Sequence, residues 1–363
     1  MNILFDIGHP AHVHLLKNTI KELQLHGHKI IITTKDVPII KRLLDNEGFS
    51  YINLGKKGEG LKGKILKQFH FFRTLYKIIK KEKIRIAAGT SMTIPLLSKI
   101  SKMSSINMDD DDDEVQKLSV LLCHPFSDVR LSPSALIGHR KSKKAIFYAG
   151  YHELAYLHPK RFKPDIKVLE KANIKKDEKF FILRFVAFKA YHDTDAHGLS
   201  LEDKRKLINI LAEKGRVIIT SEKELEPEFE KYRLSVPPED MHSLLYYSTL
   251  LIGDSQTMTS EAAVLGVPSL RCNTFVGKIA YLEEEENKYG LTYGFRPDNF
   301  DGLLSKLKEL LMNPNLKQEW IKKREKLLND KIDVTSFFVW FIENYPESKK
   351  IMKENPDYQY NFK

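Results

Sequence analysis

Cysteine and long apolar runs are scarce in this sequence, and each scarcity excludes a class of protein. Only two cysteines, Cys123 and Cys272, occur among 363 residues, too far apart for a zinc ribbon or a disulfide framework. No apolar run approaches the roughly 18 residues of a membrane-spanning helix. Met1 leads straight into a strand pattern without the features of a signal peptide, so we expect a cytoplasmic protein.

The pattern that is present predicts an α/β protein of two domains. A chain of 363 residues with 42% hydrophobic content can bury two separate cores. Apolar strand patterns alternate with helical ones in both halves, which is typical of parallel sheets covered by helices on both faces. We predict strands at 3–7, 30–34, 51–54, 84–88, 105–108, 129–131 and 145–148, and then at 180–185, 216–220, 232–236 and from 250 onward.

Composition also suggests the boundaries. A polar, proline-containing stretch predicts a linker at 156–178 between Rossmann-like domains at 1–155 and 179–325. The final helices, 326–363, have enough apolar surface to pack against something large, and the N-terminal domain is one candidate. Two doubly wound domains of this kind would face each other across a cleft at the carboxyl ends of their strands.

The net charge of +11 is concentrated in one region. Residues 56–85 contain eleven Lys or Arg and two Glu, and the rest of the chain is nearly neutral. Apolar residues recur there at helical spacing, which predicts a basic amphipathic helix over about 60–83: Ile65, Phe69, Phe72, Tyr76 and Ile79. This helix could simply cover the sheet, or its lysines and aromatic residues could also contact an anionic membrane surface or acceptor. We expect no nucleic-acid partner, because no recognition motif accompanies the patch.

The stretch 250–270 is the most informative part of the sequence. It reads as a short strand, a Gly-Asp-Ser turn and a helix that Gly266 and Pro268 close. The start of such a helix presents backbone N–H groups and a positive dipole end, which suits a phosphate. If Ser255 is the N-cap, the capping-box position falls on Met258. Glu261 then lies beyond the first turn, where it could accept hydrogen bonds from ribose hydroxyls or could simply be solvated.

Two other segments suggest a metal site, but neither supports one well. His9, His12 and His14 follow the first strand closely, yet no carboxylate or cysteine lies at matching spacing and Pro10 opposes a simple helical pair. The run 109–113 consists of five aspartates, which repel one another, and we interpret it as a solvated acidic loop just after a strand, although one carboxylate could enter the cleft. We therefore expect no metal.

Three motifs resemble a known family. They are Asp6-Ile7-Gly8-His9-Pro10-Ala11-His12-Val13-His14, Gly150-Tyr151-His152-Glu153-Leu154-Ala155-Tyr156-Leu157, and Thr257-Met258 with Glu261-Ala262-Ala263. These are similar to a bacterial and archaeal family catalogued as domain of unknown function 354, and the similarity runs nearly the full chain. More broadly, Gly253, Glu261, Gly266 and Pro268 resemble the second domain of GT-B nucleotide-sugar glycosyltransferases and of non-hydrolysing UDP-GlcNAc 2-epimerases.

The resemblance implies roles for individual residues. Glu261 would hold the ribose, and the backbone of Ser255, Gln256, Thr257 and Met258 would bind the diphosphate, although Asp254-Ser255-Gln256 replaces the paired glycines of the relatives. Gly8 and Arg184 would complete the donor site. His12 matches a histidine in the first loop of the peptidoglycan-precursor GlcNAc transferase, which makes it the candidate general base, with His14 and Asp6 as alternatives. From their positions in the sequence, and not from the resemblance, we expect sugar or acceptor contacts from His192 and Asp193, which follow the strand 180–185, from Tyr151, His152 and Glu153 beside the linker, and from His9 in the first loop. The loop 189–198 could instead be a solvent loop.

By this resemblance the protein is a GT-B glycosyltransferase of the hexosyl or N-acetylhexosaminyl class. It would move a sugar from a nucleotide donor, UDP-type in particular, to a glycan or lipid-linked acceptor in cell-surface polysaccharide or glycoconjugate synthesis. It would need no cofactor and would act in the cytoplasm or at the inner face of the plasma membrane. The alternatives are a nucleotide-sugar 2-epimerase and a non-catalytic protein that binds a nucleotide sugar or polysaccharide.

Overall fold

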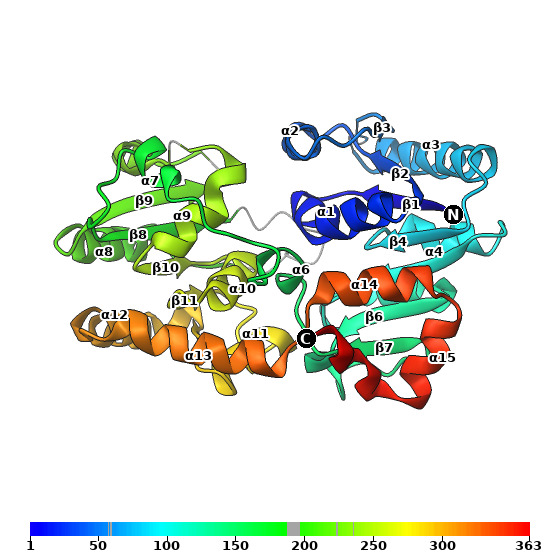
Figure 1. Ribbon diagram of the computed structural model, residues 1–363. Helices are drawn as coiled ribbons and strands as arrows, with labels where there is room; N and C mark the ends of the chain where they lie inside the picture. The colour runs from blue at the N-terminus through cyan, green and yellow to red at the C-terminus, as the bar shows by residue number, and fades with distance from the viewer. Residues whose placement is uncertain (57, 59, 187–196, 223, 235) are drawn as a thin grey trace. The chain divides into compact units, whose positions relative to one another are not determined.

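A computed structural model of the chain describes residues 1–56, 58, 60–186, 197–222, 224–234 and 236–363. Contacts divide it into two compact units, each built on one parallel sheet (Figure 1). Unit 1 comprises Met1–Tyr156 and Lys331–Lys363, and unit 2 comprises Leu157–Asp330. The fold is therefore α/β with two Rossmann-like units, as the strand and helix alternation predicted.

Unit 1 contains a seven-stranded sheet in the order β3-β2-β1-β4-β5-β6-β7. All of its strand pairs are parallel, and Leu4 of β1 lies opposite Ile31 of β2 on one side and Ala87 of β4 on the other. The strands are β1 (Asn2–Ile7), β2 (Lys29–Thr34), β3 (Ile52–Asn53), β4 (Ile86–Gly89), β5 (Ser104–Met108), β6 (Val129–Pro133) and β7 (Ala145–Tyr148).

The helices of unit 1 begin and end largely where local signals predict. The helix α1 begins at Pro10, buries the predicted Val13, Leu16, Ile20 and Leu23, and ends before Gly27, whose φ of 82° suits glycine. The helix α1 spans Pro10–Leu25. The other α-helices of unit 1 are α2 (Pro38–Asn46), α3 (Gly60–Lys81), α4 (Thr93–Ser98), α5 (Lys117–Leu122), α6 (Leu154–Leu157), α14 (Val334–Glu343) and α15 (Glu347–Glu354). Short 3-10 helices, labelled η, are η1 (His124–Phe126), η2 (Ser134–Leu136) and η6 (Pro356–Phe362).

The basic helix α3 packs against the sheet through a face that the predicted stripe matches only in part. Phe71, Leu75 and Ile79 are buried with Leu4 and other residues of the sheet core, while Phe72 and Tyr76 are half-buried beside them. Phe69, which belongs to the predicted stripe and was also a candidate for membrane contact, is 67% exposed, because the i, i+4, i+8 row from Phe71 makes the contact with the sheet. No helix in the described part of the chain is long and apolar enough to cross a membrane.

Unit 2 contains a five-stranded parallel sheet in the order β12-β11-β10-β8-β9. Its strands are β8 (Phe180–Phe185), β9 (Arg216–Ser221), β10 (Leu250–Gly253), β11 (Ser269–Cys272) and β12 (Thr292–Phe295). Its helices are α7 (Lys167–Lys171), α8 (Leu201–Ala212), η3 (Pro227–Tyr232), η4 (Pro238–Asp240), α9 (Met241–Tyr247), α10 (Gln256–Leu265), α11 (Ala280–Asn287), η5 (Pro297–Asn299), α12 (Phe300–Met312) and α13 (Leu316–Asp330).

Two predictions for unit 2 are wrong in detail. Among its described residues, the predicted strand 232–236 contributes only an isolated bridge from Arg233 to Ile219, because the short helix η3 takes up the preceding residues and Pro237 and Pro238 cannot donate ladder hydrogen bonds. The segment predicted as a linker, 156–178, belongs instead to unit 2 from Leu157 onward. It buries Val168 and Leu169, and α7 contacts α9.

The C-terminal segment 331–363 completes unit 1. In Figure 1 it is orange to red and lies beside the strands β6 and β7, and α14 packs on α1 while α15 contacts β7. Phe337 and Phe338 are fully buried, with ring centroids 5.9 and 5.2 Å from that of Tyr148. The Ile332 N–H donates to the Ala149 carbonyl over 2.9 Å, so backbone and core both anchor this segment to the first 156 residues.

We predict that Phe337→Ala destabilises unit 1 selectively, by roughly 3–5 kcal/mol, because it leaves a cavity in a packed aromatic core. The two tryptophans of the sequence lie in different units, Trp340 in unit 1 and Trp320 in unit 2. Urea unfolding followed by Trp340 in a Trp320→Phe background should show an earlier unit 1 transition, whereas Trp320 in a Trp340→Phe background should report no change. The exposed Tyr360 supplies the control, Tyr360→Ala. A shift of equal size in both transitions would contradict the assignment of Phe337 to unit 1 alone.

Candidate functional site

Each sheet has one point at which the strand order reverses, and such a point can form a crevice at the carboxyl ends of the strands. In unit 1 the order reverses between β1 and β4, and in unit 2 between β10 and β8. Loops that leave neighbouring strands in opposite directions open a crevice there, and open α/β sheets bind ligands at this point. The candidate residues that follow lie at these two points, each described within its own unit.

Asp6 lies at the reversal point of unit 1 and is held by two hydroxyls. Thr33 Oγ1 donates to Asp6 Oδ1 over 2.8 Å, and Ser91 Oγ donates to Asp6 Oδ2 over 2.6 Å. Burial raises the pKa of Asp6, and the two hydrogen bonds reduce this shift without cancelling it. Both oxygens of this candidate base are therefore already in use.

His12 projects from the first turn of α1 towards the loop that follows β4. Thr90 Oγ1 lies 2.7 Å from its Nδ1 and 2.9 Å from its Nε2. Burial, with contributions from His9 and His152, lowers the pKa of His12 to about 3, and Asp110 opposes this shift. The imidazole is therefore uncharged at pH 7, and so low a pKa makes it a weak base in this state.

The neighbouring candidates differ in their placement. His9 caps α1, with its Nδ1 accepting from the Ala11 N–H, and its ring lies 5.7 Å from that of His12. His14 is two residues beyond His12, so it projects from a different face of the helix, where its ring lies 5.5 Å from Tyr156. Gly8 has open space where a Cβ would point, which leaves room for a ligand.

The aspartate run 109–113 is not the solvated loop that the sequence suggested. Asp109 and Asp112 are buried, and Asp109 Oδ2 lies 2.7 Å from Arg130 Nη2 and 3.0 Å from Arg140 Nη2. Burial alone would raise the pKa of Asp109, but His124 and the two arginines hold it below its ordinary value. The mutual repulsion that predicted solvent exposure is offset by these two buried guanidinium groups.

Asp110 makes a second pair, with His152 at the end of β7. Its Oδ2 lies 3.0 Å from His152 Nδ1. Burial disfavours the charged imidazole, but Asp110 and the nearby carboxylates outweigh it and raise the pKa of His152. Since His152 and Asp110 both shift the pKa of His12, the structure brings these three side chains within electrostatic range at the carboxyl end of the sheet.

The remaining predicted residues near β7 are buried around this pair. Tyr151 is fully buried, with Lys331 Nζ 4.5 Å from its ring centroid, and Glu153 is also buried. Three carboxylates, those of Asp109, Asp110 and Asp111, lie within 4.8 Å of one another and could share a cation by distance alone. The guanidinium groups that already neutralise Asp109 disfavour that use.

The reversal point of unit 2 is built around Asp254, which immediately follows β10. Its Oδ1 accepts from the Val186 N–H over 2.7 Å, and Asn273 Nδ2 donates to its carbonyl over 2.8 Å. Burial raises the pKa of Asp254 to about 6, although the Val186 N–H, Lys204 and Arg184 oppose the shift. The residue before it must be glycine, since a Cβ on Gly253 would lie 2.1 Å from the Arg184 carbonyl oxygen.

The helix α10 begins as the sequence predicted, with Ser255 as its N-cap and Gly266 at its end with φ of 75°. Ser255 Oγ accepts from the Met258 N–H over 3.3 Å, so this N–H is engaged by the cap. Gln256 and Thr257 occupy the first two helical positions, whose N–H groups have no carbonyl partner within the helix. They are the groups best placed to bind an anion.

Glu261 and Arg184 are both engaged with other side chains. Glu261 is buried, and its Oε1 lies 2.9 Å from Nε2 of the buried His242 on α9, which excludes the solvated interpretation of this glutamate. Arg184 donates to Thr220 Oγ1 over 3.0 Å and pairs with Glu222 at 2.5 Å, which holds its guanidinium at the carboxyl end of β9. The predicted sugar contacts His192 and Asp193 lie outside the described residues.

Sequence reasoning missed four groups that contact predicted site residues, namely Thr90, Ser91, Asp110 and His242. It also missed Arg130 and Arg140, which pair with Asp109. One signal was available. Arg130 interrupts the apolar strand β6, and a buried parallel strand tolerates an arginine only where a carboxylate pairs with it. Nothing local marks His242 as the partner of Glu261.

These two sheets and their reversal points place the protein in the GT-B class of α/β folds. Similar solved structures include S. aureus MnaA in a co-structure with UDP (14% identity, 96% of this chain and 97% of that chain, TM-score 0.65). They also include a Methanocaldococcus jannaschii UDP-GlcNAc 2-epimerase in complex with UDP-GlcNAc and UDP (13%, 86% and 93%, TM-score 0.62). A third is the glycosyltransferase VinC in complex with dTDP (13%, 98% and 100%, TM-score 0.60). At this identity the likeness shows the fold.

The chain belongs to the family described as "Protein of unknown function (DUF354)", whose model matches residues 1–289. A relative in Methanocaldococcus jannaschii, the uncharacterized protein MJ0665, is 24% identical over an alignment of 301 residues that covers 79% of this chain and 86% of that protein. The family resemblance seen in the three motifs is therefore confirmed.

We predict that Asp254→Asn stabilises unit 2 in a pH-dependent way. Below the ordinary aspartate pKa of 3.8 the carboxyl is protonated in both states, so the variant and the parent should be equally stable. As pH rises the unfolded state ionises first, and the parent loses stability relative to the variant until the difference levels off above about pH 6, at on the order of 3 kcal/mol. Asparagine keeps the oxygen that accepts from the Val186 N–H.

The measurement is urea unfolding followed by Trp320, repeated across pH 3–8. The exposed Asp177, in the same unit, gives the control Asp177→Asn, for which no pH-dependent gain is expected. A gain for Asp254→Asn that is constant with pH, or that shrinks as pH rises, would show that burial of this charge is not what the substitution relieves.

Proposed function

We propose that the protein is a nucleotide-sugar glycosyltransferase in which unit 2 binds the nucleoside diphosphate and unit 1 supplies the proton-transfer groups. The observation that carries the proposal is the start of α10. A serine-capped helix at a strand-order reversal point, with a buried glutamate two turns along, has the features of a site for a diphosphate and ribose. Three solved structures of the same fold that bind UDP, UDP-GlcNAc or dTDP support this choice of ligand.

In this proposal the diphosphate would contact the N–H groups of Gln256 and Thr257, and Ser255 would fix their direction. Arg184 would add positive charge from the end of β8, in competition with its present partner Glu222. Glu261 would accept hydrogen bonds from the ribose hydroxyls, with His242 fixing the orientation of its carboxylate. UDP is the expected nucleotide.

His12 is the general base in our proposal, because both oxygens of Asp6 accept hydrogen bonds and His14 lies on another face of α1. The acceptor oxygen would bond to the anomeric carbon while its proton passes to His12. The bond from that carbon to the diphosphate would break, and the electron pair would leave with the phosphate. Asp110 and His152 lie within electrostatic range of His12 and would influence the stability of the imidazolium that forms.

We propose that this chemistry uses no metal or other cofactor. Positive charge for the leaving diphosphate would come from the helix start and Arg184 in unit 2. The carboxylate cluster of unit 1 is drawn into ion pairs with Arg130 and Arg140, so its net charge attracts a divalent cation less than the sequence alone suggests.

We predict that Glu261→Gln weakens binding of UDP at least tenfold, because the neutral amide accepts ribose hydrogen bonds less strongly than a carboxylate. The exposed Glu309→Gln is the matched control.

His12→Gln should leave UDP affinity within twofold and should lower glycosyl transfer by roughly 10²–10⁴-fold. Calorimetry would measure affinity, and a thermal-shift screen of nucleoside diphosphates and nucleotide sugars would first identify the donor.

Unfolding midpoints without ligand would separate a damaged fold from a lost contact. If Glu261→Gln keeps its midpoint and its UDP affinity, the donor site is not at α10. If no nucleotide or nucleotide sugar raises the midpoint of the parent protein, the proposal fails as a whole.

A 2-epimerase is the second candidate, favoured by the likeness to several UDP-GlcNAc 2-epimerases and by the buried acid and base groups of unit 1. It would act on a nucleotide sugar without an acceptor. Incubation with UDP-GlcNAc alone in deuterated water separates the two activities. Deuterium incorporated at C2 supports the epimerase, whereas an unlabelled sugar that is transferred only when an acceptor is added supports the transferase.

We further propose that α3 brings the protein to an anionic membrane surface that carries a lipid-linked acceptor for cell-surface polysaccharide synthesis. Leu66 and Phe69 are 72% and 67% exposed, and the lysines of the last two turns point into solvent. Exposed apolar side chains beside lysines have the chemistry of a peripheral membrane helix. This location would be at the inner face of the plasma membrane.

We predict that the protein sediments with phosphatidylglycerol vesicles and not with phosphatidylcholine vesicles, and that salt weakens the binding. Phe69→Ser and the triple variant Lys77→Glu, Lys80→Glu, Lys81→Glu should each reduce the bound fraction severalfold. Leu25 is 84% exposed in α1, so Leu25→Ser controls for the loss of any exposed leucine-sized side chain. The proposal would be contradicted if binding did not depend on lipid charge, or if the triple variant bound as well as the parent.

A further inference from the structure

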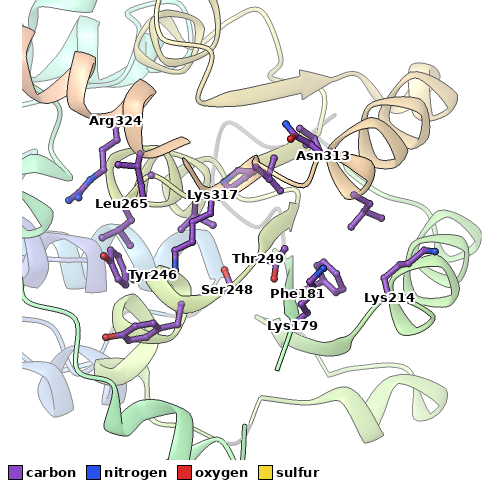
Figure 2. A pocket seen from close by; sticks show the side chains of 18 of the residues that line it. Lys179, Phe181, Lys214, Tyr246, Ser248, Thr249, Leu265, Asn313, Lys317 and Arg324 are labelled. Carbon is purple, nitrogen blue, oxygen red and sulfur yellow. The ribbon is translucent and has the colours of Figure 1, made fainter. Parts of the chain in front are cut away.

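Unit 2 contains a pocket at the end of the sheet opposite to the first turn of α10. Figure 2 shows this pocket, whose volume is about 350 Å³, within the size range of small-molecule sites. Its lining includes the residues immediately before three strands: Lys179 before β8, Thr249 before β10 and Pro268 before β11. Because parallel strands all start at one edge, these residues mark the amino-terminal edge of the sheet.

The inner wall of the pocket is apolar. Phe181, Leu265, Val267, Leu310 and Leu316 are all buried and all line it. They come from strands and helices that also form the core of unit 2, so the wall is fixed by packing. An apolar chain or ring placed against it would lose contact with water and gain dispersion contacts.

The charged residues of the lining are all basic. They are Lys179, Lys214, Lys317 and Arg324, and none of the 19 lining residues is acidic. In Figure 2 the three lysines reach the pocket from separate elements. None of these four side chains forms an ion pair with a carboxylate of the described residues. Lysines elsewhere in the unit, such as Lys171 and Lys206, do form one. Four uncompensated positive charges around a concave surface concentrate an anion there.

Neutral polar groups of the lining are largely used within the protein. Ser248 Oγ donates to the Leu245 carbonyl, Tyr247 donates to the Pro164 carbonyl, and Asn313 donates to Glu319. Arg324 Nε donates to the Val264 carbonyl over 2.7 Å, which fixes its guanidinium beside the apolar wall. A ligand would therefore be recognised by charge and apolar contact more than by the directional hydrogen bonds that a nucleobase requires.

We propose that this pocket binds a small amphipathic anion, an apolar chain that ends in a phosphate or a carboxylate. The chain lies against the wall of Phe181, Leu265 and Leu316, and the anionic end lies among the lysines and Arg324. The site is separate from the proposed nucleotide site, and it goes beyond the proposed transferase function.

The test uses n-decyl phosphate as the probe, below its micelle concentration, in calorimetry with the full chain. Binding should be at least tenfold tighter than that of n-decanol, which lacks the charge, and of inorganic phosphate, which lacks the chain. Equal affinity for n-decanol, or no binding of n-decyl phosphate, would overturn the proposal.

Three variants locate the binding. Lys317→Glu should weaken n-decyl phosphate at least tenfold, whereas Lys322→Glu, an exposed lysine of the same helix outside the lining, should change it less than twofold. Ile321 is 44% exposed at the rim, so Ile321→Trp can fill the pocket without disturbing the core, and it should abolish binding while the unfolding midpoint is retained. Affinity unchanged in both Lys317→Glu and Ile321→Trp would place the probe elsewhere and overturn the assignment.

Glu261→Gln distinguishes the two sites of unit 2. It should leave n-decyl phosphate binding unchanged, so loss of UDP binding in that variant bears only on the nucleotide proposal. Loss of n-decyl phosphate binding in Glu261→Gln would instead show that the probe occupies the nucleotide site.

Discussion

Parallel strand pairing is the constraint on which both candidate sites depend. In each unit every strand pair is parallel, so each connection must return across the sheet and all carboxyl ends collect at one edge. Residues far apart in sequence are brought together there, as Asp6, His12, Asp110 and His152 show in unit 1. The opposite edge collects the residues that precede the strands, which is why the basic pocket of unit 2 is spatially separate from the start of α10.

At these edges, the pKa of each ionisable group depends on how its charge is buried and paired. Within the few residues that follow β5, Asp109 has a lowered pKa because two arginines neutralise it, whereas the pKa of Asp111 is raised by burial and by the neighbouring carboxylates. The pKa values of the two histidines also shift in opposite directions: that of His12 is lowered and that of His152 is raised. Ionisable groups whose environments separate their pKa values in this manner are typical of sites that accept and donate protons.

The features that were predictable from sequence are those set by local signals. The start of α10 at Ser255, its end at Gly266 and the buried stripe of α1 all follow from capping residues and apolar spacing. The errors concern contacts between distant residues. Asp109 follows β5 and Arg130 lies on β6, 21 positions further along, and Glu261 and His242 lie on different helices, so no local pattern links either pair. The inward face of α3 was misjudged because its aromatic residues surround the helix and only the sheet selects Phe71. The chain returns to unit 1 at Lys331, five residues after the start that the sequence suggested for the final apolar helices.

That return has a consequence for how the protein is made. Residues 331–363 supply α14, whose phenylalanines cover Tyr148 and whose Thr335 hydroxyl donates to the Ala155 carbonyl over 2.7 Å. The residues that form the rest of unit 1 leave the ribosome first, but their core stays open until this segment has been translated. Unit 2 is contiguous and can fold in the meantime, so during synthesis the second half of the chain can reach its native state before the first.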